Sequence, residues 1–185
     1  MNHDYDIVIA GGGLAGLTLA SALAPTGARI AVIEASPPQA DTPPSFDDRA
    51  IALAHGSRLI FEGIGLWDAI APSATPIRKI HVSERGKFGF THLDAAEEQV
   101  PALGYVTLAR SLGQALLAHF GTTGIDFFCP ALLVDLDNGH EGVTLTIDAE
   151  DGTRKLRTKL LVAADGGQSQ IRERLGIKVR KWDYG

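Results

Sequence analysis

The sequence lacks several features that would assign a protein to a class at once. It has a single cysteine, Cys129, so no disulfide can form within the chain, which suits a reducing compartment such as the cytoplasm. Its 22 acidic residues outnumber the 17 basic ones, which argues against a broad nucleic-acid-binding surface. Residues 1–6 lack the basic start and apolar run of a signal peptide. No run of about eighteen apolar residues is present to span a bilayer.

Glycine, by contrast, is abundant, and three of the 21 glycines define the stretch around which the chain is organised. An apolar strand-like run leads through Gly11, Gly13 and Gly16 into a helical pattern, and a second apolar run ends at Glu34. A strand, a tight turn, a helix and a second strand closed by an acid are typical of a dinucleotide site. The pattern predicts an α/β protein with a Rossmann-like parallel sheet.

Each residue type in this stretch has a physical role beside a nucleotide. Gly11 allows the tight turn, Gly13 lets the backbone approach a pyrophosphate, and Gly16 lets the helix pack closely against the strand. The unpaired backbone amides at the start of the helix, where Leu14 and Ala15 lie, would meet the phosphates. The glycines therefore predict the phosphate side of the site.

The acid at the end of the second strand completes the predicted site. Glu34, which Ala35 follows, is placed to accept hydrogen bonds from a ribose hydroxyl. These residues alone are compatible with either NAD or FAD. The next stretch, residues 35–48, holds four prolines and is predicted to be an irregular loop.

Arg49 follows this loop, and two interpretations of it compete. In one, Arg49 pairs with Asp47 or Asp48 on a solvated turn. In the other, its planar guanidinium reaches the nucleotide phosphates and binds their oxygens bidentately. The spacing of the residues alone does not separate the two.

The middle of the chain changes from helical to strand-like patterns. Helices are predicted at residues 55–63, 66–70 and 110–120, and a buried parallel strand at residues 125–128. Residues 77–83 and 88–93 alternate like the two strands of a hairpin. This hairpin fits poorly into an alternating strand-helix pattern, so it is assigned to an inserted β region.

Three further strand-like runs, residues 132–136, 143–147 and 155–157, are separated by Asn-Gly and Asp-Gly dipeptides that favour hairpin turns. They predict a three-stranded antiparallel meander within residues 131–157. Because a meander cannot continue a doubly wound pattern, it is expected to lie over the sheet as a connection. A separate strand at residues 160–164 then returns to the core.

A second motif follows that strand, where Asp165 and Gly166 lead into a helix that begins near Ser169. Taken alone, this segment is a turn with a capping serine. The carboxyl ends of parallel strands, however, meet at one edge of a sheet, so Asp165 is expected on the same rim as the glycines. Charge repulsion disfavours its carboxylate beside bare phosphate, so a contact through its backbone or with another part of the ligand is expected.

Together these segments resemble the single-component FAD-dependent aromatic hydroxylases. The resemblance rests on the glycine fingerprint with Glu34, the segment around Arg49, and the Asp165-Gly166 motif with Ser169 and Arg172. More narrowly, four segments resemble the ubiquinone-biosynthesis branch of that family: residues 46–53, 65–67, 81–86 and 182–185.

The resemblance implies a role for each candidate residue. Gly11, Gly13 and Gly16 would surround the FAD pyrophosphate, and Glu34 would hold the adenosine ribose. Arg49 matches the family's phosphate-binding loop arginine, and Arg110 matches the arginine or glutamine at a helix start. Asp165 and Gly166 match a motif associated with both FAD and NADPH.

The resemblance also implies a reaction and its partners. NAD(P)H, as a transient reductant, would reduce FAD, and the reduced flavin with molecular oxygen would hydroxylate the ring of a polyprenyl phenol. Because such a substrate is lipid-like, a cytoplasmic protein is expected that contacts the inner membrane peripherally or joins a complex of ubiquinone-biosynthesis proteins. The scattered histidines show no paired metal-ligand spacing, so no metal is expected.

The expected domain plan follows from the same resemblance. Residues 1–75 and 104–177 would form the FAD-binding domain, residues 76–103 part of an inserted β substrate region, and residues 178–185 the start of a substrate domain. Members of the family continue for about as long again, so the chain is expected to be an N-terminal fragment with weak FAD binding and no hydroxylation alone. The alternatives are a non-catalytic nucleotide-binding module, or a flavin reductase or halogenase on the same framework.

Overall fold

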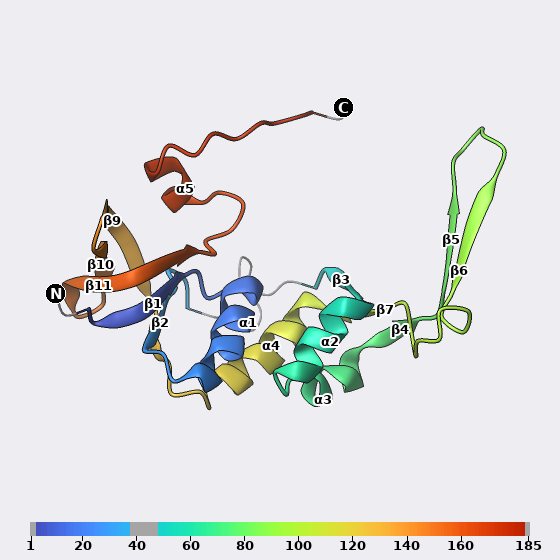
Figure 1. The fold of residues 1–185 in the computed structure, drawn as a ribbon, viewed down its shortest axis with the longest axis horizontal. Coiled ribbons are helices and arrows are strands. Elements are labelled where there is room, and N and C mark those ends of the chain that lie inside the picture. Colours follow the sequence, from blue (N-terminus) through green and yellow to red (C-terminus); the bar gives the residue numbers. More distant parts are fainter. Residues whose placement is uncertain (1–2, 38–47, 184–185) are drawn as a thin grey trace. The chain divides into compact units, whose positions relative to one another are not determined.

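The computed structural model describes residues 3–37 and 48–183, and their contacts divide the chain into two compact units (Figure 1). One unit is formed by residues 1–38 together with 120–185, and the other by residues 39–119. Most of the loop predicted at residues 35–48 lies outside the described residues, as do Phe46 and Asp47. The finer domain boundaries expected from the sequence stay a prediction.

The first unit is built on a six-stranded sheet in the order β8-β2-β1-β11-β10-β9. Its strands are β1 (Tyr5–Ala10), β2 (Ile30–Ile33), β8 (Asp126–Phe128), β9 (Ala131–Gly139), β10 (Gly142–Ala149) and β11 (Gly152–Ala163). Strands β8, β2, β1 and the second half of β11 run parallel, so that Ile9 lies between Val32 and Val162. Every residue of β2 is buried, which explains its uninterrupted apolar sequence. The predicted Rossmann-like sheet is confirmed.

Helix α1 (Leu14–Leu23) connects β1 to β2 and contacts both strands. Leu17 and Ala20 are fully buried on its inner side. A short 3-10 turn, η1 (Ala24–Thr26), ends the helix, and Gly27 then reverses the chain with a φ of 74° that favours glycine. Among the described residues, no helix is both long and apolar enough to cross a membrane.

The meander differs from its predicted form. Residues 155–157 and 160–164 were expected as separate strands, and this was wrong, because residues 152–163 form the single strand β11. Thr158 lies at its midpoint and pairs with Val143 of β10 on one side and with Tyr5 of β1 on the other. No turn-forming residue separates the two predicted strands, so the chain continues in extended form. The meander is therefore hydrogen-bonded into the sheet rather than set over it as a separate connection.

The side chains of the meander nevertheless pack with those of the parallel strands. Ten buried residues form one apolar cluster: Val8, Ala10, Ala31, Ile33, Ala131, Leu133, Leu145, Ile147, Leu156 and Ile171. Four of them come from β1 and β2 and five from the meander strands, so the same cluster holds both halves of the sheet together. Burial of this apolar surface is the main stabilising contribution to the unit.

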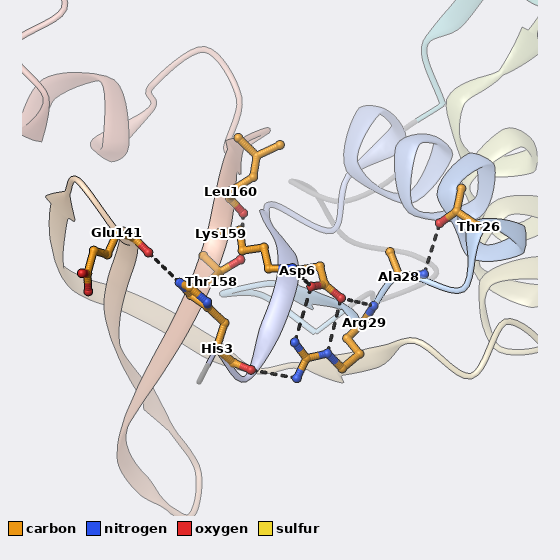
Figure 2. A network of polar contacts seen from close by, with 9 residues as sticks. All are labelled: His3, Asp6, Thr26, Ala28, Arg29, Glu141, Thr158, Lys159 and Leu160. Atoms are coloured by element: carbon orange, nitrogen blue, oxygen red, sulfur yellow. Dashed lines mark hydrogen bonds and ion pairs between the residues drawn. The ribbon is translucent and has the colours of Figure 1, made fainter. Parts of the chain in front are cut away.

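Polar contacts tie the amino-terminal ends of β1 and β2 to the middle of β11 (Figure 2). The Asp6 carboxylate accepts hydrogen bonds from the backbone amide of Arg29 at 3.0 Å and from its Nε at 3.3 Å, and it pairs with Lys159 Nζ at 2.7 Å. Arg29 also donates to the carbonyl oxygen of His3 at 2.7 Å. These contacts, led by the one with Lys159, hold the pKa of Asp6 well below its usual range.

The second unit contains a three-stranded sheet in the order β3-β7-β4. Its elements are β3 (Ala50–Ala54), α2 (His55–Gly63), α3 (Trp67–Ile70), η2 (Ala71–Ser73), β4 (Thr75–Ile77), β7 (Gly104–Leu108) and most of α4 (Ala109–Phe120). The sequence did not predict β3, because its alanine-rich composition carries no strand preference of its own. Pairing with β7 along its whole length gives β3 its extended form.

The predicted hairpin is confirmed as strands β5 (Lys79–Ser83) and β6 (Phe90–Asp94), which pair only with each other among the described strands. It forms the narrow two-stranded ribbon of Figure 1. Most of its side chains are exposed, including those of Phe88 beside the turn and Phe90. The hairpin therefore contributes almost nothing to a core within the described chain.

Candidate functional site

The glycine turn begins directly after β1 and lies against the ends of two neighbouring strands. The Gly11 amide donates to the carbonyl oxygen of Ile33, at the end of β2, over 2.7 Å. A Cβ atom added to Gly11 would lie 2.2 Å from the carbonyl oxygen of Ala164 and 3.0 Å from the amide nitrogen of Asp165, just beyond β11. Gly11 also has a φ of 113°, which side chains rarely adopt. Glycine is therefore required here by both conformation and space.

Gly16 brings helix α1 close to this turn. A Cβ atom at Gly16 would lie 1.8 Å from the carbonyl oxygen of Gly11, so any side chain would force the helix away. Gly13, the residue before the helix, differs, because an added Cβ would meet no atom within 4 Å. The backbone at Gly13 therefore faces open space, as a position approached by a ligand requires.

The start of α1 can accept an anion in that space. No side chain caps the helix at Gly13, and its first turn has no acidic residue. The amides of Leu14, Ala15 and Gly16 belong to the first turn of an α-helix, whose N–H groups lack partners within the helix. Together with the positive end of the helix dipole, such amides bind phosphate oxygens. The positions of Leu14 and Ala15 agree with the predicted phosphate site, and their contact with a cofactor stays a prediction.

Glu34 is held against the glycine turn by backbone amides. Its Oε2 accepts from the Gly12 amide at 2.6 Å, and its Oε1 accepts from the Ser36 amide at 2.9 Å. A carboxylate has about four acceptor positions, so both oxygens retain capacity for a further donor. The two amides fix the orientation of a charged acceptor, which suits recognition of a ribose hydroxyl. Ala35, the neighbouring candidate, is exposed.

The sequence missed the parts that Gly12 and Ser36 play in this arrangement. Gly12 is the middle residue of a glycine run, and a Cβ atom there would lie 2.9 Å from the Cβ of Glu34. The fingerprint assigns no role to this position, and the contact exists only because the ends of β1 and β2 lie side by side. Its signal in the sequence was that glycine also occupies position 12, between the two fingerprint glycines Gly11 and Gly13.

Asp165 lies on the same rim, as the strand order predicted. Its Oδ2 accepts from the Ile171 amide at 3.2 Å, at the start of the short helix α5 (Gln170–Arg174), which Ser169 caps through the Arg172 amide. Its Oδ1 is buried and has no hydrogen-bond partner among the described residues. A buried acceptor without a donor costs free energy, so a ligand hydroxyl or amide at this point would be stabilised. Gly166 follows with a φ of 80°, which turns the chain away.

The two candidate arginines belong to the second unit, where β3 begins beside the end of its antiparallel partner β7. The carbonyl oxygen of Arg49 accepts from the Ala109 amide at 2.9 Å, and the exposed Arg49 side chain precedes β3. Arg110 forms an ion pair with Asp48. The sequence offered Asp47 or Asp48 as a partner for Arg49. Asp47 lies outside the described residues, and the Asp48 carboxylate pairs with Arg110. Phosphate binding by either arginine stays a prediction.

The residues of the first unit fit the adenosine diphosphate side of FAD. The site combines free space at Gly13, an uncapped helix start, an oriented carboxylate at Glu34 and an unpartnered acceptor at Asp165. Each of these groups offers what a pyrophosphate or a ribose needs. None of them supplies a redox group, so any oxidation would depend on a bound cofactor.

Comparison with known proteins agrees with this geometry. A family model described as FAD binding domain matches residues 4–183. Ubiquinone hydroxylase UbiL of Rhodospirillum rubrum is 38% identical over 181 residues, which cover 97% of this chain and 41% of the relative. The 3-demethoxyubiquinol 3-hydroxylase of Escherichia coli is 35% identical over 99% of this chain and 46% of its own length. The chain thus spans less than half the length of these relatives.

Solved structures of hydroxylases share the fold. OxyS anhydrotetracycline hydroxylase from Streptomyces rimosus superposes with a TM-score of 0.79 and 26% identity, over 97% of this chain and 35% of that protein. A ternary complex of aklavinone-11 hydroxylase with FAD and aklavinone gives a TM-score of 0.74 and 26% identity, over 95% of this chain and 35% of that protein. These matches confirm the predicted fold class, FAD as the cofactor and the resemblance to ubiquinone-biosynthesis hydroxylases. The chain belongs to the FAD binding domain family.

Proposed function

We propose that the protein containing this chain is an FAD- and NAD(P)H-dependent monooxygenase that hydroxylates the aromatic ring of a polyprenyl phenol in ubiquinone biosynthesis. The names of the relatives UbiL and 3-demethoxyubiquinol 3-hydroxylase support this reaction. Within that branch, the segments at residues 46–53, 65–67, 81–86 and 182–185 resemble 2-octaprenyl-6-methoxyphenol hydroxylase, which favours a substrate of that type.

The observation that carries the proposal is the oriented Glu34 carboxylate beside the open backbone of Gly13. In the proposed complex, the amides of Leu14, Ala15 and Gly16 bind the pyrophosphate, and Glu34 accepts from the adenosine ribose. Bound FAD supplies the redox chemistry. The described residues position the cofactor. Because this chain covers 41% and 46% of the length of these two relatives, we propose that it binds one end of FAD, the adenosine diphosphate end.

Asp165 and the two arginines extend this proposal. The unpartnered Oδ1 of Asp165 would accept a hydrogen bond from a hydroxyl of the cofactor. Gly166, which has no side chain, would let the backbone at this position approach the cofactor closely. Arg49 and Arg110 would pair with phosphate oxygens, for which a planar guanidinium is well suited. Arg110 would then exchange the Asp48 carboxylate for phosphate.

The proposed reaction also determines the partners. Its substrates are molecular oxygen, NAD(P)H as transient reductant and a polyprenyl phenol, whose long apolar chain partitions into lipid. We therefore propose a cytoplasmic protein in peripheral contact with the inner membrane, or in a complex of ubiquinone-biosynthesis proteins. The chain's net charge of -5 supports the further proposal that nucleic acid is not a partner.

Substitution of Glu34 tests the site. In the full-length protein, Glu34→Ala removes a charged acceptor from the ribose, and hydrogen bonds to charged groups contribute about 1.5–3 kcal/mol each. The dissociation constant of FAD should rise by about tenfold or more, measured by flavin fluorescence titration. Glu98→Ala, at an exposed glutamate of the second unit, is the matched control and should leave it unchanged. Equal FAD affinity in both variants would remove the ribose assignment.

The reaction is tested separately with purified full-length protein, FAD, NADPH and a polyprenyl phenol. The product should gain one oxygen atom by mass spectrometry, and NADPH should be consumed only when FAD is present. FAD binding without any hydroxylated product, across polyprenyl phenols of several ring patterns, would contradict the proposed substrate class and favour a reductase.

A further inference from the structure

Two histidines lie opposite each other on the exposed hairpin. The strand register pairs His81 of β5 with His92 of β6, so both side chains project from the same face. His81 Nδ1 and His92 Nε2 are 2.6 Å apart, and the ring centroids are 4.7 Å apart. The two histidines are eleven positions apart in the sequence, which is why no metal-ligand spacing was visible there.

A hydrogen bond between these nitrogens needs one proton between two lone pairs. The donating ring can change tautomer by exchanging this proton, through solvent, for one on its other nitrogen. His81 Nδ1 and His92 Nε2 then both present lone pairs, and each ring keeps the same number of protons. A metal ion between imidazoles needs metal–nitrogen distances of about 2.0–2.1 Å. Two such bonds at neighbouring coordination positions place the nitrogens roughly 3 Å apart, so a small rotation of the two exposed side chains is enough.

The surroundings keep the pair in place and leave it accessible. The Phe90 ring lies beside both imidazoles, with centroids 5.6 Å from His81 and 4.9 Å from His92. The next register pair on the same face, Lys79 with Asp94, is closed by an ion pair of 3.0 Å, so the Lys79 ammonium already has a carboxylate partner. Both histidines are exposed. Nothing described on the hairpin therefore blocks an ion from reaching the two nitrogens.

We propose that His81 and His92 form a two-histidine site for a divalent transition metal ion, with water completing the coordination. Within the described chain, no group of three or more histidine, cysteine or acidic residues could hold a metal, so the open positions belong to solvent. Imidazole ligands suit Zn²⁺, Cu²⁺ and Ni²⁺, and not the hard cations Mg²⁺ and Ca²⁺. The ion would link β5 to β6 and restrain the hairpin. This site is independent of the proposed flavin chemistry.

The site is tested with Zn²⁺ as the probe. In the ¹⁵N-labelled protein, Zn²⁺ should shift the ring-nitrogen resonances of His81 and His92 and leave those of His140, an exposed histidine of the first unit, unchanged. His81→Gln and His92→Gln should each weaken Zn²⁺ binding, measured by calorimetry. Loss of an outer-sphere partner already costs metal sites about 10–100-fold in affinity, so loss of a direct ligand should cost at least as much.

Control variants separate a specific site from other binding. His140→Gln should bind Zn²⁺ as the unsubstituted protein does, and Mg²⁺ should give no shift at any histidine. Circular dichroism checks that each variant is folded. Two results would overturn the proposal: equal shifts at all histidines, which indicate adventitious binding only, or unchanged Zn²⁺ affinity when both His81 and His92 are replaced.

Discussion

The glycine turn and the β5–β6 hairpin are both short and glycine-containing, yet the surrounding chain constrains them very differently. At the turn, an added Cβ atom would lie within 3 Å of neighbouring atoms at Gly11, Gly12 and Gly16. At the hairpin glycines, Gly86 and Gly89, it would meet nothing within 4 Å. At Gly11 and Gly12 the turn is fixed by contacts distant in sequence, with Ile33, Ala164 and Glu34, whereas the hairpin is fixed by its own strand register. The turn should therefore be sensitive to substitution for lack of space, whereas the hairpin should tolerate substitution except at Gly86 and Gly89, whose φ of 80° and 117° favours glycine.

Gly16→Ala should have the largest effect. Its methyl group would lie 1.8 Å from the Gly11 carbonyl oxygen, so α1 must move or the turn must open. We expect destabilisation of about 1–3 kcal/mol or more, as for overpacked cores, together with loss of flavin binding. Gly13→Ala is the matched control, because its methyl group enters open space. It should lower the melting temperature far less than Gly16→Ala, because only the modest helix-capping preference for glycine is lost, and it should still weaken FAD binding. Equal losses of stability in the two variants would contradict the contrast.

Asp6→Asn should have an intermediate effect that depends on pH. The pKa of Asp6 is lowered in the folded chain, chiefly by Lys159, so its charged form contributes stability above the carboxyl pKa of the unfolded chain, about 3.9. That contribution is lost as the pH falls towards the lowered pKa. The variant should be less stable than the unsubstituted chain at pH 7, and the difference should shrink below about pH 4. Urea unfolding at several pH values measures it, and a difference independent of pH would contradict the ion-pair account.

Phe88→Ser should have the smallest effect. The Phe88 side chain is fully exposed beside the hairpin turn, so its removal uncovers no core. Surface substitutions of this kind usually change stability by less than about 0.5 kcal/mol. The melting temperature of this chain should stay within experimental error. A clear decrease would show that Phe88 packs against another part of the molecule, and that the hairpin is less independent than its strand register implies.

The sequence predicted those features whose cause is local. The strand, turn and helix from Tyr5 to Leu23 follow from apolar runs and glycine positions, and the hairpin follows from alternation around a polar turn. What the sequence missed depends on distant pairing. β3 is a strand only because β7 lies beside it, and Asp48 pairs with Arg110, which is 62 positions away in the sequence. The pairing of His81 with His92 could not be predicted, because it depends on which residues of β5 and β6 lie opposite each other. The sequence pattern predicts a hairpin but does not fix that register to a single residue.

The fusion of two predicted strands into β11 has a consequence for how this chain can be divided. The first half of β11 completes the meander, its second half completes the parallel sheet, and Thr158 belongs to both. A cut anywhere within residues 152–163 leaves one of the two with an unpaired edge. The meander therefore cannot be removed from this chain without cutting the strand that pairs with β1, whereas β5 and β6 pair with no other described strand.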